Sequence, residues 1–117
     1  MLAALLLAAS APAIRSVPAE TWVRVYRRVW LECAFTETDR LIDSRQPIDA
    51  SVSHALSHCE ARHAQYERAL VDRLREAGAD DPEKIVAEEV RLSIRDLTAQ
   101  LREYLRKARE DAAFHAR

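Results

Sequence analysis

Apolar residues recur at helical spacing, three and four positions apart, along three segments of the chain, and no segment shows the alternation typical of a β-strand. We therefore predict α-helices at residues 18–43, 50–77 and 82–114. The connections between these segments are short, which favours helices that run antiparallel to their neighbours. The pattern predicts an all-α protein, a small antiparallel three-helix bundle.

The first predicted helix carries more apolar residues than one contact face needs. One stripe runs along Trp22, Tyr26, Val29, Cys33 and Thr36. Val23 and Trp30 lie off this stripe and suit a second contact within the bundle. Leu31 and Phe35 are then left without an obvious neighbour.

Because aromatic residues and arginine are enriched at protein interfaces, the surplus apolar residues of the first helix suggest a candidate interaction surface. We predict that it contains Leu31 and Phe35 together with Arg24, Arg27 and Arg28. Taken by themselves, the three arginines favour an ordinary solvated helix face.

The second predicted helix has one continuous apolar stripe, and either Asp49 or Ser51 suits its N-cap. Gly78 is the only glycine and lies where a helix end favours a left-handed residue. The stripe consists of Val52, Leu56, Cys59, His63, Tyr66, Leu70 and Leu74.

The third predicted helix has the clearest start, since Asp81 suits the N-cap and Pro82 the first helical position. Its apolar residues then follow a heptad-like pattern over about three heptads. The predicted seam is Ala87, Val90, Ile94, Leu97, Leu101, Tyr104 and Ala108.

The two cysteines, Cys33 and Cys59, each lie thirteen residues from Gln46, on either side of the predicted turn. If the first two helices form a hairpin, the two sulfur atoms lie at the same height, so we predict a disulfide that staples these helices. Two alternatives remain open at this point. The thiols could be free and buried, or they could bind zinc together with His63, although a structural zinc site needs a fourth ligand.

The first thirteen residues have no charged side chain, and Ala11-Pro12-Ala13 has the small-x-small form of a signal-peptidase site. We predict a cleaved signal peptide at residues 1–13 and one helical domain at residues 14–117. The predicted location is the periplasm or the extracellular space. The segment has no Lys or Arg before its apolar core, so the alternative is a cytosolic bundle in which it belongs to the fold.

Composition limits the classes of partner. The chain has 117 residues, 32% of them charged, and a net charge of −1 with acids and bases interleaved. No strong basic field is available for nucleic acid, and no segment approaches the roughly 20 apolar residues that span a bilayer. We expect no nucleic-acid binding and no stable membrane insertion after processing.

The sequence gives little indication of catalysis or of a cofactor. It contains no glycine-rich phosphate loop and none of the common hydrolase or metalloprotease motifs. His54 and His58 are spaced to bind a surface metal weakly, but the sequence places no acid to complete a site, so we favour solvated histidines. For His63 we expect a hydrogen bond to a neighbouring side chain within the core. We predict that the protein is not an enzyme and uses no cofactor.

The sequence thus predicts an exported structural or interaction protein that acts through contacts with an unknown protein partner or as a homodimer. The alternative is a small binder of a metal ion or of an apolar ligand in the cell envelope, through the histidines or the aromatic residues of the first helix.

Overall fold

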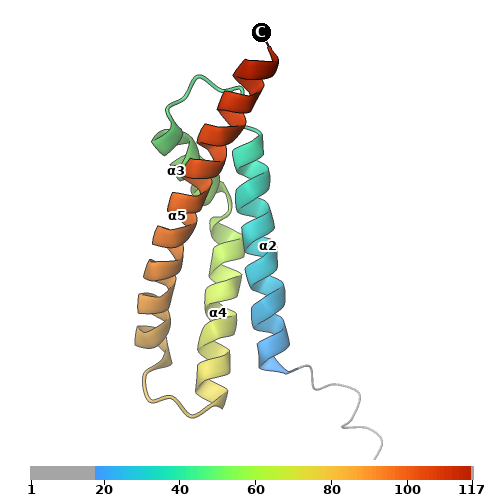
Figure 1. The fold of residues 1–117 in the computed structure, drawn as a ribbon. Helices are drawn as coiled ribbons and strands as arrows, with labels where there is room; N and C mark the ends of the chain where they lie inside the picture. The colour runs from blue at the N-terminus through green and yellow to red at the C-terminus, as the bar shows by residue number, and fades with distance from the viewer. Residues whose placement is uncertain (1–17, 117) are drawn as a thin grey trace, which may run out of the picture.

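The computed structural model describes residues 18–116, which form four α-helices and no strand (Figure 1). The all-α prediction is confirmed, but the predicted number of helices is wrong. The helices are α2 (Ala19–Asp39), α3 (Ile48–His58), α4 (Glu60–Glu76) and α5 (Pro82–His115). The predicted signal peptide at residues 1–13 lies outside the described residues.

Helices α2 and α4 lie side by side and share the most extensive helix contact of the bundle (Figure 1). Helix α5 packs on α4 and α3 and has a smaller contact with α2. The C-terminal end of α5 extends beyond the other helices. One helical hairpin, from α2 through α3 to α4, thus provides most of the scaffold, and α5 covers it.

The second predicted helix is divided in two, because the backbone leaves the helical region at Cys59, with φ −96° and ψ 13°. No proline or glycine lies at this position to signal the break. The predicted N-cap is also wrong: Pro47 occupies it, with Asp49 inside the first turn. Ser51 is buried within α3, and its hydroxyl donates a hydrogen bond to the Gln46 carbonyl at 3.3 Å.

The signals at the helix ends around the last turn are confirmed. Asp81 is the N-cap of α5, and its carboxylate accepts a hydrogen bond from the Lys84 backbone N–H at 3.3 Å. Gly78 has φ +83°, and the Ala79 N–H after it donates to the Leu74 carbonyl at 3.0 Å. This bond is part of the Schellman motif, which needs a left-handed residue at the position of Gly78.

The core differs in detail from the predicted stripes. On α2, Trp30 is 3% exposed whereas Trp22 is 45% exposed, so the helix presents the edge that contains Trp30 to the bundle. Thr36, the last residue of the predicted stripe, is exposed. The main buried cluster consists of Val23, Trp30, Ala34, Val52, Cys59, Tyr66, Ala69, Leu97, Leu101 and Leu105.

The seam predicted on α5 is correct in its centre and wrong at several other positions. Val90, Leu97 and Leu101 are buried as predicted. The exposed positions of the predicted seam are Ala87, Ile94 and Tyr104, and the buried positions that it omits are Val86 and Leu105. The contact face of α5 therefore follows a different line along the helix from the predicted heptad seam.

Helix α2 ends at Asp39, four residues before the predicted end, and residues 40–47 lead to α3. This connection is held by Arg109 of α5. Its guanidinium donates hydrogen bonds to the carbonyls of Leu41 at 2.8 Å, Gln46 at 2.9 Å and Ile42 at 3.2 Å. A fourth bond, at 3.2 Å, reaches the Ser51 hydroxyl. One side chain thus pairs backbone oxygens that lie beyond the end of a helix and have no helical partner.

We expect Arg109→Met to lower the free energy of unfolding by about 1.5–3 kcal/mol, the range for hydrogen bonds to a charged group. Arg109→Lys should recover only part of this loss, because an ammonium group cannot form the same planar set of contacts. Urea denaturation followed by circular dichroism measures both variants.

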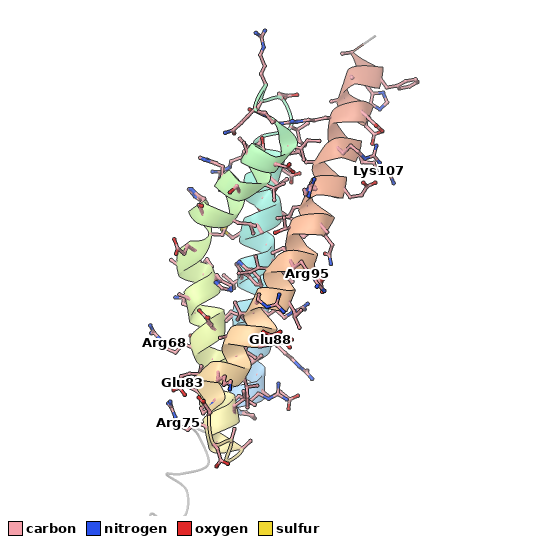
Figure 2. The ribbon with its side chains drawn as sticks, turned by 90° about the vertical axis from the view of Figure 1, so that its left-hand side faces the viewer. Arg68, Arg75, Glu83, Glu88, Arg95 and Lys107 are labelled. Atoms are coloured by element: carbon pink, nitrogen blue, oxygen red, sulfur yellow. A yellow bond between two sulfur atoms is a disulfide. The ribbon has the colours of Figure 1, made fainter. Side chains whose placement is uncertain are left out.

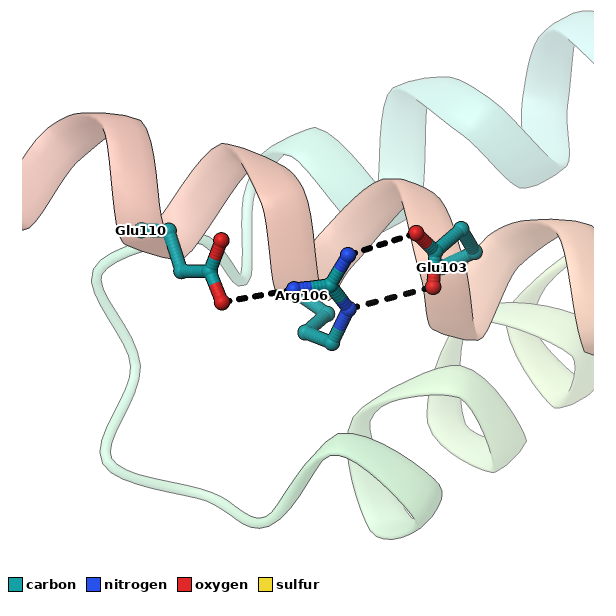
Figure 3. Close-up of polar contacts among 3 residues, drawn as sticks. All are labelled: Glu103, Arg106 and Glu110. Carbon is teal, nitrogen blue, oxygen red and sulfur yellow. Dashed lines mark hydrogen bonds and ion pairs between the residues drawn. The ribbon is translucent and has the colours of Figure 1, made fainter.

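The matched control is Arg106, which lies one turn earlier on α5 and also forms several hydrogen bonds. Its partners are Glu103 and Glu110 of the same helix, and all three side chains are exposed to solvent (Figure 3). Arg106→Met should cost less than about 1 kcal/mol, as is usual for exposed ion pairs. Equal losses for Arg106→Met and Arg109→Met would contradict the proposed role of Arg109.

Candidate interaction surface

A groove runs between α2 and α4 towards the N-terminal end of α2 and the C-terminal end of α4. Its cavity has a volume of about 420 Å³. Helix α2 contributes one wall and helix α4 the other. The lining residues are Ala19, Trp22 and Tyr26 from α2, and Gln65, Arg68, Ala69, Asp72 and Glu76 from α4.

The α2 wall of the groove is aromatic. Trp22 and Tyr26 lie one turn apart and stack, with ring centroids 5.9 Å apart and ring planes at 27°. Trp22 remains 45% exposed, although it is among the largest apolar residues of the chain. An indole that stays accessible beside a cavity is the kind of side chain that dominates binding energy at protein interfaces.

The α4 wall is polar and carries both signs of charge. Arg68 is a solvent-exposed side chain of α4 (Figure 2). Asp72 lies 3.8 Å from Arg75, and Arg75 also pairs with Glu83 across the turn to α5. Glu76 ends the helix. The small residue Ala69, which is buried, also lines the groove.

The disulfide between Cys33 and Cys59 is present, as the spacing predicted, and joins Cα atoms 5.9 Å apart. Because the bond uses both sulfur atoms, neither alternative for these residues applies: they are not free thiols, and they are not zinc ligands. Cys33 lies three turns along α2 from Trp22, so the bond fixes the helix that carries the aromatic wall relative to α4.

The predicted interaction residues do not form one exposed patch. Leu31 and Phe35 are half-buried and pack against the core, and the rings of Phe35 and Tyr104 form a T-shaped pair with centroids 5.2 Å apart. Arg24 and Arg28 are exposed and lie 3.7 Å from Glu20 and 2.9 Å from Glu32, respectively. Arg27 is exposed as well. Partner binding through these five residues stays a prediction.

The three histidines of α3 and α4 occupy different environments. His54 is exposed, and His58 lies 3.6 Å from the carboxylate of Glu37, an acid from α2 that the sequence pattern did not place there. His63 packs on Trp30, with ring centroids 4.6 Å apart. The expected side-chain partner of His63 is not found for Nε2, which is buried without a hydrogen bond to any residue in 18–116. Within the same residues, no group of three His, Cys, Asp or Glu is arranged to hold a metal ion.

Three side chains with shifted pKa values, Tyr66, Tyr104 and Glu103, form packing contacts or hydrogen bonds within the helix bundle. Burial raises the pKa of the Tyr66 phenol, although the guanidinium of Arg27 opposes this effect. The hydrogen bond from the Tyr104 hydroxyl to Asp39 raises the pKa of that phenol. Hydrogen bonds from Arg106 hold the pKa of Glu103 below its usual range. None of these three groups lines the groove beside Trp22.

Compared with known proteins, the chain matches no protein-family model, no curated protein and no solved structure. Among residues 18–116, no helix is both long and apolar enough to cross a bilayer. A disulfide in such a chain is compatible with a periplasmic or extracellular protein.

Proposed function

We propose that this chain is an exported helical interaction protein, and that it binds a protein partner through the groove between α2 and α4. Export is supported by the disulfide, since such bonds persist in oxidising compartments, and by the signal-like pattern of residues 1–13. No catalytic role is proposed.

The main support for an interaction role is the exposed Trp22 ring. This ring stacks on Tyr26 in the wall of a cavity of about 420 Å³. Burial of this ring by a partner removes a large apolar surface from water. The crosslinked helices hold the site in one geometry, so little conformational entropy is lost on binding.

The partner that fits is a helical segment with an apolar side chain between two charges of opposite sign. The apolar side chain packs on Trp22 above Ala69. Arg68 and Glu76 lie eight residues apart on α4, which is about 12 Å along the helix axis. An acid and a base on the partner at this separation complement both side chains.

The test compares Trp22→Glu with Ile85→Glu. Ile85 is a matched control because it is also a large exposed apolar residue, 51% exposed, but lies on α5 and does not line the groove. We expect a protein from the envelope or medium of the source cell to bind the wild type and Ile85→Glu. Trp22→Glu should weaken that binding by about 2 kcal/mol or more, roughly thirtyfold, the scale of an interface hot spot.

The binding assay uses the purified partner and surface plasmon resonance, with sedimentation of the free protein beside it. Equal affinity of both variants for every co-purified protein would contradict the groove as the site. Concentration-dependent self-association that Trp22→Glu removes would mean that the occupant is a second copy. Export has its own test, because mass spectrometry of the native protein should find residues 1–13 removed.

A further inference from the structure

The C-terminal end of α5 presents a large apolar side chain to solvent. Phe114 is 71% exposed, more than any other large apolar residue among residues 18–116. It lies in the last turn of α5, where this helix extends beyond the other helices (Figure 1). Its ring pairs with that of the adjacent His115, with centroids 5.6 Å apart. Because this turn lies beyond the bundle, a surface that buries Phe114 has to come from another molecule.

Charged residues flank Phe114 in a fixed order along the chain. The acids Glu110 and Asp111 precede it by about one helical turn. The bases His115 and Arg117 follow it in the sequence. Read from the N-terminal to the C-terminal side, the order is therefore acid, apolar ring, base.

The groove beside Trp22 has the complementary order of charges along α4. The base Arg68 comes first, and the acids Asp72 and Glu76 follow it towards the end of the helix. The cavity of about 420 Å³ is large enough for the ring of Phe114, since an apolar cavity of about 150 Å³ accepts benzene. Acids meet the base, and bases meet the acids, when the end of α5 runs in the same direction as α4.

This direction determines how two copies of the chain lie relative to each other. Within one copy, α4 and α5 run antiparallel, because only residues 77–81 separate them (Figure 1). An α5 end that runs along the α4 of another copy therefore belongs to a molecule in the antiparallel orientation. The groove lies towards one end of the molecule and the end of α5 lies at the other (Figure 1). Two antiparallel copies thus bring each α5 end to the groove end of its partner, and one two-fold axis relates both contacts.

We propose that two copies form an antiparallel dimer in which Phe114 of each copy enters the groove beside Trp22 of the other. Asp111 then lies on the side of Arg68. The proposal rests on the groove as the binding site and names a second copy as its occupant when no other partner is bound. Burial of two exposed aromatic rings supplies the main favourable term. The two contacts form within one complex, so the first raises the effective concentration for the second.

The experiment is analytical ultracentrifugation of the oxidised full chain over a range of micromolar concentrations. The wild type should show a monomer–dimer equilibrium. Phe114→Glu and Trp22→Glu should each weaken it by about thirtyfold or more, the scale of an interface hot spot. Ile85→Glu, at another exposed apolar position of α5, should leave it unchanged. An equimolar mixture of Phe114→Glu and Trp22→Glu should associate more strongly than either variant alone, because one intact ring and one intact groove can meet.

A charge reversal tests the orientation. Arg68 and Asp111 are exposed, and neither forms an ion pair with another residue in 18–116. Arg68→Glu should weaken the dimer by about fivefold, the upper range for an exposed ion pair. Adding Asp111→Arg to the same chain should restore the association, because it re-forms the pair with the signs exchanged.

Three results would overturn the dimer: a wild type that stays monomeric, a Phe114→Glu variant that associates like the wild type, or a mixture that associates no better than its components. None of them bears on the proposed function, because binding of a purified protein partner is measured separately by surface plasmon resonance. Phe114→Glu leaves the groove intact and should bind that partner like the wild type. Loss of partner binding in Trp22→Glu but not in Phe114→Glu supports the groove even if the dimer does not form.

Discussion

Replacing Cys33 and Cys59 together by alanine is expected to lower the free energy of unfolding by about 3–4 kcal/mol. The bond closes a loop across a sequence separation of 26 residues, and in the chain-entropy model it stabilises the fold by restricting the unfolded chain. In a domain of this size, such a loss is a large part of the total stability.

The measurement is urea denaturation, monitored by circular dichroism, of three samples: oxidised wild type, wild type with its disulfide reduced, and the double alanine variant. The last two should unfold at similar, lower urea concentrations. If reduction leaves the midpoint of the wild type unchanged, the crosslink does not stabilise this fold.

When the disulfide is removed, we expect the largest loss of local stability in α3. This helix has 11 residues, and an isolated helix of that length is marginal in water. Its stability depends on contacts at both of its ends: the disulfide at Cys59, and the hydrogen bonds of Arg109 to Gln46 and Ser51. Hydrogen exchange of the reduced protein should therefore accelerate in α3 more than in α5.

The features that were predictable from the sequence are those set by local chemistry. The N-cap at Asp81 and the left-handed Gly78 depend on residues a few positions apart, and both are confirmed. The disulfide was predictable because two antiparallel helices place residues equidistant from the turn at the same height.

The features that were not predictable depend on tertiary contacts. The break at Cys59 has no glycine or proline to signal it. Helix α2 is apolar around much of its surface, so its pattern could not decide whether Trp22 or Trp30 faces the core. Arg109 donates hydrogen bonds to backbone carbonyls more than 60 residues away in the sequence. Every residue has such a carbonyl, so no residue type in the sequence signals these contacts. For the same reason the pattern puts Trp22 on a contact stripe and leaves Leu31 and Phe35 without a neighbour, whereas Trp22 is 45% exposed and the other two pack against the core.

The second large effect is expected for Leu105→Ala, which should lower the free energy of unfolding by about 2–5 kcal/mol. Leu105 is 0% exposed and belongs to the main buried cluster, although the heptad pattern omits it. Truncation leaves a cavity beside the C-terminal half of α5, and closely packed neighbours fill such a space only in part.

The matched control is Ile94→Ala, because the heptad pattern places Ile94 on the seam while the structure leaves it 36% exposed. Ile94→Ala should lower the free energy of unfolding by only about 1 kcal/mol, because part of the Ile94 side chain is already exposed to water. Thermal and urea unfolding of both variants give the two losses. A larger loss for Ile94→Ala than for Leu105→Ala would mean that α5 is rotated towards the heptad seam. In that case Ile94 would enter the core.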